Sequence, residues 1–110
     1  MSADACVVYY GLCFEIGENE IEDCERRRDS RIIAARSSHL NYYWADFGMS
    51  DERNMIFVGT EIGVFGPENL LEVRLSRLDM QQIQQQTEEK LGRSGLQGEP
   101  KLLVQWLVDK

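Results

Sequence analysis

Three residues have types and spacing that could support chemistry: His39, Tyr42 and Asp46. On a helix they stand at i, i+3 and i+7, so their side chains would line one stripe, and Tyr43 at i+4 from His39 would add an aromatic wall. His39 would titrate near neutral pH, Asp46 would fix its tautomer or raise its pKa, and Tyr42 would donate a hydrogen bond to a ligand. The pattern predicts a small-ligand site at these four residues. The competing interpretation is a histidine at the boundary of an apolar helix face.

This site depends on a helix over residues 30–47. Apolar residues there fall near a helical stripe that stops at Gly48. The alternative is a strand over 42–47, with Tyr42, Trp44 and Asp46 on one side and Tyr43, Ala45 and Phe47 on the other. Because neither of those faces is cleanly polar, the helix is favoured, although a carboxylate at Asp46 is unfavourable in the last turn.

Other kinds of chemistry find little support in the sequence. The chain holds one histidine and three cysteines, Cys6, Cys13 and Cys24, without CxxC spacing, so zinc, iron and disulfide frameworks are disfavoured. Gly59, Gly63 and Gly66 do not have the spacing of a dinucleotide-binding loop, and there is no GxxxxGK[ST] or GxSxG motif. We therefore expect no catalytic residues, no metal and no cofactor, and inert, buried thiols.

The charge of the chain is acidic and uneven. The net charge is −7, and residues 1–29 hold eight carboxylates against three arginines. Such a field repels nucleic acid and anionic membrane surfaces, so direct binding to either is not expected. The acidic residues of a short predicted helix could instead contact a basic protein partner. These residues are Glu18, Glu20, Glu22 and Glu25.

Composition and periodicity predict a single α+β domain over residues 1–110. Residues 6–16 are apolar on both faces, as in a central strand, and 70–76 alternate as in a half-exposed strand. The first crossover is a helix broken near Asp29–Ser30, with its first part at about 20–28. The remaining elements are a strand beginning near Asn54, a helix opened by Ser76 and Asp79 that finishes near Gly92 or Gly95, and a strand over 101–108 with Leu102, Val104, Trp106 and Val108 inward.

The resulting βαββαβ order predicts a ferredoxin-like arrangement, in which a four-stranded antiparallel sheet carries both helices on one face. That topology is compatible with many functions. We expect a non-catalytic interaction or regulatory module, such as an adaptor, subunit or inhibitor, with a homodimer formed through an exposed sheet face as a further expectation. The alternative is a ligand-binding protein or modest enzyme with its pocket at His39, Tyr42 and Asp46. The N-terminal residues suggest no signal peptide or membrane span, and the cysteine usage suggests the cytoplasm.

Overall fold

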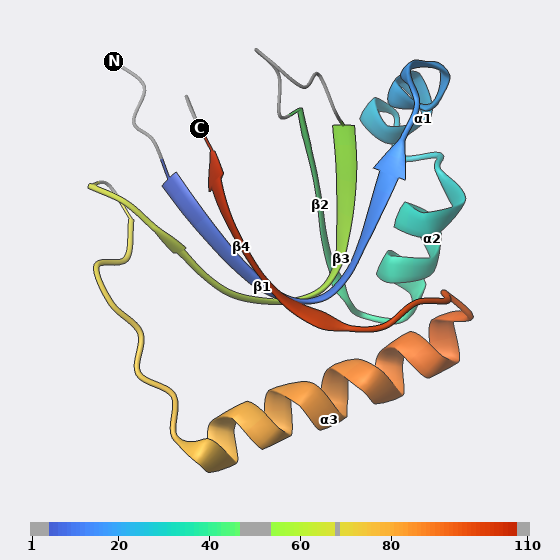
Figure 1. Ribbon diagram of the computed structural model, residues 1–110. Helices are drawn as coiled ribbons and strands as arrows, with labels where there is room; N and C mark the ends of the chain where they lie inside the picture. The colour runs from blue at the N-terminus through green and yellow to red at the C-terminus, as the bar shows by residue number, and fades with distance from the viewer. Residues whose placement is uncertain (1–4, 47–53, 68, 108–110) are drawn as a thin grey trace.

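The structure is a computed structural model that describes residues 5–46, 54–67 and 69–107. It contains a sheet and several helices (Figure 1). The strands are β1 (Ala5–Ile16), β2 (Asn41–Asp46), β3 (Asn54–Phe65) and β4 (Lys101–Leu107). The helices are the 3-10 turn η1 (Glu18–Glu20), α1 (Ile21–Glu25), α2 (Ser30–Ser37) and α3 (Arg77–Ser94).

The four strands form an antiparallel sheet in the order β2-β3-β1-β4. The predicted α+β class and four-stranded antiparallel sheet are therefore confirmed. β1 is a central strand, as its two apolar faces predicted, because it pairs with β3 over Cys6–Ile16 and with β4 over Ala5–Gly11. The outer strands are β2 and β4.

The predicted helix over 30–47 is wrong in its second half. The break at Asp29–Ser30 is present, since Asp29 caps α2 by accepting from the backbone N–H of Arg31, but α2 ends at Ser37. Residues 41–46 instead form β2, paired with β3 from Asn41↔Gly59 to Asp46↔Asn54. Tyr and Trp favour extended backbone, and pairing with β3 lets both apolar faces be buried, which the isolated periodicity does not reveal. Phe47 lies outside the described residues.

The predicted strand over 70–76 is also wrong. Apart from an isolated bridge between Phe65 and Leu70, this segment has no strand partner among the described residues, and it leads irregularly into α3. Alternation alone does not make a strand: beyond that bridge the segment does not pair with the part of β3 that β2 leaves open after Gly59. The helix that follows is as expected: Ser76 and Asp79 form a reciprocal capping box, and α3 gives way at Gly95, which has φ +81°.

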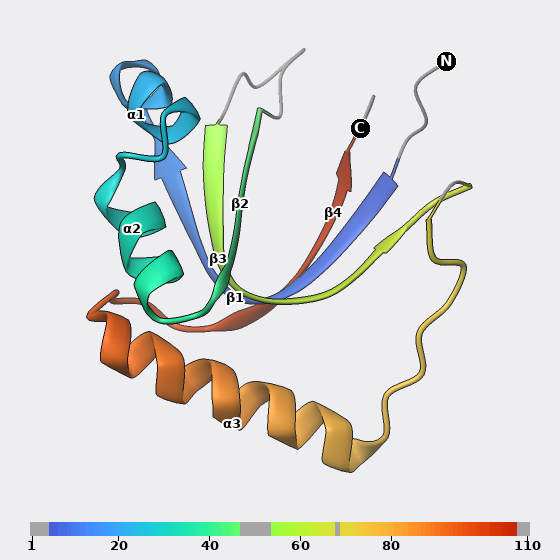
Figure 2. The same ribbon diagram turned by 180° about the vertical axis from the view of Figure 1, so that it is seen from behind.

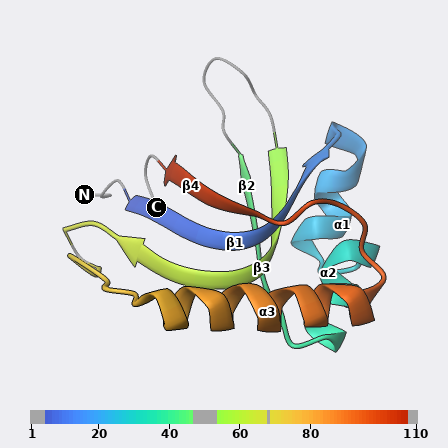
Figure 3. The same cartoon turned by 60° about the horizontal axis from the view of Figure 1, so that its bottom comes forward.

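The two faces of the sheet differ in their cover. Figures 2 and 3 show α2 and α3 on the outer side of a strongly bent sheet, whose inner side carries neither helix. A core fills the space between the helices and the sheet. Its buried members are Leu12, Ile16, Cys24, Ile32, Ala35, Leu40, Ile56, Val58 and Leu91. A smaller cluster on the inner side contains Val7, Tyr9 and Phe57.

The bend coincides with a close contact between two glycines. Gly11 and Gly59 face one another near the middle of β1 and β3, and a Cβ on Gly59 would lie 2.2 Å from the carbonyl oxygen of Tyr10. No side chain fits at that distance. Two side-chain hydrogen bonds join α3 to the sheet at the residues next to these glycines: Thr87 bonds to Thr60, and the Tyr10 hydroxyl donates to Glu88. The straight α3 therefore meets the bent sheet at its apex.

We predict opposite effects for two glycine substitutions. Gly59→Ala should lower the free energy of unfolding by about 1–3 kcal/mol or more, because the new methyl group meets backbone that cannot move aside. Gly92→Ala, in α3 with open space around its Cα, should raise it by about 0.5–1 kcal/mol through helix propensity alone. Urea denaturation of both variants measures the difference. Equal stability of Gly59→Ala and the wild type would contradict the close strand contact.

Candidate functional site

The strand at 41–46 separates the residues of the predicted ligand site. In β2 neighbouring side chains point to opposite faces, and Tyr42 packs with Trp44 against the core beneath the helices, while Tyr43 packs with the inner cluster. The helical stripe of His39, Tyr42 and Asp46, with Tyr43 beside it, is therefore wrong as a geometry. Asp46 lies at the end of β2, opposite Asn54. A ligand-binding role for these residues stays a prediction without its original structural basis.

His39 belongs to the turn between α2 and β2. Its backbone is left-handed, with φ +60°, its side chain is exposed, and its carbonyl oxygen accepts from the Lys90 ammonium at 3.4 Å. A positive φ in a residue other than glycine allows the sharp reversal that sends the chain into β2. The position therefore has a clear conformational role.

The inner face of the sheet carries three packed aromatic rings. Tyr9, Tyr43 and Phe57 have ring centroids 5.9–6.2 Å apart, at a separation typical of favourable aromatic pairs. Burial, with a smaller effect from the nearby Glu61 carboxylate, raises the pKa of Tyr9 far above its ordinary value. The hydroxyl of Tyr9 is thus neutral at physiological pH and unsuited to act as a base.

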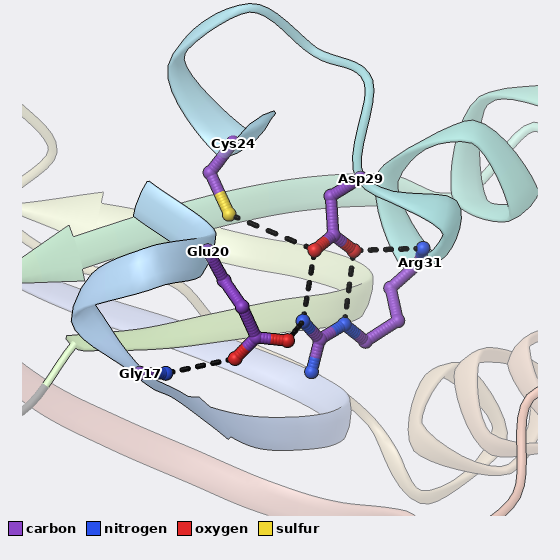
Figure 4. A network of polar contacts seen from close by, with 5 residues as sticks. All are labelled: Gly17, Glu20, Cys24, Asp29 and Arg31. Atoms are coloured by element: carbon purple, nitrogen blue, oxygen red, sulfur yellow. Dashed lines mark hydrogen bonds and ion pairs between the residues drawn. The ribbon is translucent and has the colours of Figure 1, made fainter. Parts of the chain in front are cut away.

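Glu20, one of the acidic residues of the predicted partner site, forms hydrogen bonds within the chain. Figure 4 shows Glu20 turned toward Arg31, with Oε1 at 3.0 Å from Nη2, while its Oε2 accepts from the Gly17 N–H at 2.8 Å. Arg31 also makes a two-point contact with Asp29, at 2.9 Å through Nε and 2.8 Å through Nη2. The Arg31 guanidinium lies 5.8 Å from the centre of the Phe14 ring. This network joins η1 to the start of α2, so Glu20 acts mainly within the chain.

The other acidic residues of the predicted partner site are exposed. Glu22 pairs with Arg26 at 2.9 Å in an i,i+4 arrangement, while Glu18, in η1, and Glu25, at the end of α1, lie exposed. An exposed pair of this kind contributes little to stability. Glu18, Glu22 and Glu25 are therefore the members of the set that a partner could reach without breaking the Arg31 network.

Cys13 and Cys24 lie in environments that suppress thiolate formation. Burial, together with Glu15, raises the pKa of Cys13 to about 11, and burial with Asp29 raises that of Cys24. Cys13 lines a hollow of ≈430 Å³ beside the C-terminal half of β1, with Gln97, Glu99 and Lys101 at its rim. Because the thiolate is the nucleophile, a thiol with a raised pKa is a poor one at neutral pH. This hollow lacks an activated nucleophile in the part of the chain described.

The surface that the sequence did not predict is an apolar groove of ≈230 Å³ between the N-terminal half of α3 and the sheet. Three elements border it: the sheet forms its floor, the 70–76 segment closes one end, and α3 forms a wall. The lining residues are almost all apolar: Val8, Tyr10, Ile62, Phe65, Val73, Leu75, Met80, Ile83, Gln84 and Leu102. These residues together make up the apolar groove.

The apolar groove continues onto the outer strand β4. Leu102, Val104 and Trp106 lie on the face toward the helices. The exposed fractions of their surfaces are 62%, 64% and 56%, respectively. The sequence predicted these three side chains to face inward. They do point to the side that carries the helices, but they are exposed rather than buried, because α3 does not cover this strand. Val108 lies outside the described residues. The sequence does contain a signal for this surface, namely the apolar residues of 70–76 and of the first turns of α3. Among them, Leu71, Leu78 and Met80 are also exposed.

Comparison of the chain with protein-family models, with curated proteins and with solved structures gives no match. Within the described ranges, no cluster of three His, Cys, Asp or Glu side chains could hold a metal ion. None of the described helices is long and apolar enough to span a membrane. The functional argument therefore depends on this chain's own surfaces.

We predict that Asp29→Asn lowers the free energy of unfolding by about 1–3 kcal/mol, because it leaves the Arg31 guanidinium without its buried carboxylate while keeping a side chain that can cap α2. Asp29→Ala should cost about 1 kcal/mol more, since it removes the cap as well. Glu72→Gln is the matched control: it breaks the Glu72–Arg74 pair, which is exposed, and should change stability by less than about 1 kcal/mol.

The same network predicts a pH dependence. The Arg31 guanidinium holds the pKa of Asp29 below its ordinary value, so folding favours the ionised form. This contribution is fully present above the unfolded-state pKa of about 3.9 and is lost as the pH falls through the folded-state value. Urea denaturation between neutral pH and the acid limit should show a smaller acid-induced loss for Asp29→Asn than for the wild type. Parallel curves for the two proteins would contradict the assignment.

Proposed function

We propose that this protein is a non-catalytic interaction module that binds another protein chain through the apolar groove and the exposed face of β4. The observation that carries this proposal is the exposure of Leu102, Val104 and Trp106 beside a groove lined by apolar side chains. Monomeric soluble proteins rarely leave a continuous apolar surface of this kind, and such surfaces are usually binding sites. Large aromatic and aliphatic side chains are also typical anchors of interfaces.

The environment of the groove favours binding of a protein over catalysis. Its lining contains one tyrosine, Tyr10, whose hydroxyl donates to Glu88 at 3.1 Å, and otherwise only Gln84 carries a polar side chain. An acid–base reaction needs a titratable group with a pKa near the working pH. Tyr10 has a raised pKa because of burial and Glu88. The groove is therefore suited to bury apolar side chains rather than to transfer protons.

The fold supports a ferredoxin-like assignment, which we include in the proposal. β1 and β2 lie on either side of β3, and β4 lies on the other side of β1, with a helical connection before β2 and before β4. In such an arrangement the edge strand and the adjoining helix lie side by side on the surface. A partner can therefore contact β4 and α3 together.

The acidic residues Glu18, Glu22 and Glu25 form a second part of the proposal, as a surface that attracts a basic partner. They belong to η1 and α1, which follow the C-terminal end of β1. Trp106 lies near the other end of β1, where it pairs with Cys6. Exposed charges of this kind mainly raise the rate of association and are screened by salt.

Binding can be tested by affinity capture from cells that make the protein, followed by titration of the purified pair by calorimetry. Leu102→Asp should lower the affinity by about tenfold or more, because it places a carboxylate in the apolar contact. Leu102 is 62% exposed, so the fold should tolerate the change, which thermal denaturation checks. Gln85→Asp, on the exposed outer side of α3, adds the same charge elsewhere and should leave the affinity unchanged. Retention of every captured protein by Leu102→Asp would overturn the proposed surface.

The acidic part is tested on a complex with a basic partner protein. Glu18→Lys with Glu25→Lys should slow association with a basic partner by about 2–10-fold at low salt, with little difference at high salt. Stopped-flow or surface plasmon resonance measurements at two ionic strengths give the rates. Glu89→Lys is the control, since it reverses an exposed charge on α3 at a residue that does not line the apolar groove. An unchanged rate at low salt would remove the acidic residues from the binding surface.

A further inference from the structure

We infer that the partner of this surface is a second copy of the chain, and that β4 pairs antiparallel with β4 of that copy across a two-fold axis at Val104. The inference rests on the proposed function, because it names the occupant of the same apolar surface.

The edge of β4 lacks the features that usually prevent strand addition. β4 is an outer strand, so its backbone groups on one side have no strand partner among the described residues. Natural edge strands are protected by charged residues, proline or bulges. Between Leu102 and Trp106 the sequence is LLVQW, with no charged residue and no proline, and the β1–β4 register runs without a shift from Ala5↔Leu107 to Gly11↔Lys101. The strand can therefore template another strand.

A two-fold axis at Val104 gives a register that places the apolar residues together. With Val104 opposite Val104 of the second copy, Leu102 of each chain faces Trp106 of the other, and directly opposed residues share a face. Six apolar side chains then form one continuous row on the helix-bearing side. The Trp106 indole of the second copy lies next to Leu102, which lines the apolar groove. In the dimer, Trp106 of each chain therefore packs beside the apolar groove of the other.

The charge distribution fits a second copy better than a basic partner at this surface. Residues 69–107, which supply α3, the 70–76 segment and β4, contain five acidic and five basic residues and are neutral, whereas residues 1–68 carry the whole net charge of −7. A chain with a net charge of −7 repels its own copies in most orientations. The neutral side is the one by which two copies can approach without that repulsion, while a basic protein would be drawn to the acidic end.

The oligomeric state tests this inference directly. Light scattering coupled to size exclusion, over a range of loading concentrations, should show a mass of twice 12.7 kDa that falls toward one chain on dilution. Val104→Lys should raise the dissociation constant by about tenfold or more, because the symmetry axis places two like charges side by side and removes an apolar pair. Val104→Thr, which keeps a β-branched strand former, and Gln85→Lys, which adds the same charge on α3, should both remain dimeric.

A cross-link tests the register. Opposed residues of an antiparallel pair have Cα atoms about 4.5–5.5 Å apart, a separation that a disulfide can span. Val104→Cys should therefore give a disulfide-linked dimer on mild oxidation, with the 104–104 linkage identified by peptide mass spectrometry, whereas Gln85→Cys should not. Dimerisation of Val104→Lys as tight as that of the wild type, or the absence of a 104–104 linkage, overturns the inference.

The outcomes separate this inference from the proposed function. A chain that stays monomeric at every concentration, yet loses a captured protein in Leu102→Asp, refutes the second copy as occupant and leaves the interaction function in place, with a different partner at the same surface. A monomeric chain from which Leu102→Asp removes no captured protein overturns both.

Discussion

A straight helix cannot follow an arched sheet, and the described structure depends on this mismatch. β1 and β3 approach so closely at Gly11 and Gly59 that no side chain fits between them, and the sheet bends there. α3 touches the outer side near this apex, through the contacts of Thr87 with Thr60 and of Glu88 with Tyr10. Away from the apex, the helix and the sheet separate at both ends.

The two separations are filled in different ways. Toward the C-terminal end of α3, where Leu91 is buried, α2 enters the gap and completes the core with Ile32 and Ala35. Toward the N-terminal end, the irregular 70–76 segment closes the gap incompletely, which leaves the apolar groove. The Asp29–Arg31–Glu20 network contributes to the first of these arrangements, because it fixes where α2 begins relative to the end of β1. The candidate binding surface thus exists because α2 fills the gap only at the C-terminal end of α3 and leaves the N-terminal end open.

The sequence predicted those elements whose signals are local. The capping box at Ser76 and Asp79, the left-handed Gly95 and the break at Asp29 each involve residues a few positions apart, so a single sequence reveals them. The strand at Tyr42–Trp44 forms because it pairs with an edge of β3 that comes later in the chain. Residues 70–76 pair with no strand beyond the bridge between Phe65 and Leu70, because the path of the chain after β3 leads them away from the sheet edges. The exposure of Trp106 depends on the direction in which α3 leaves the sheet. These are properties of tertiary packing. For this reason the predicted histidine stripe was wrong, and the predicted inward face of β4 is exposed rather than buried.

The different burial of the two tryptophans has a spectroscopic consequence. The chain contains two tryptophans. Trp44 is partly buried against the core beneath the helices, and Trp106 is 56% exposed on the outer strand. Their emission therefore reports separate events: the blue-shifted component follows the integrity of the fold, and the red-shifted, quencher-accessible component follows whatever covers β4. A single fluorescence measurement can distinguish loss of structure from occupation of the surface.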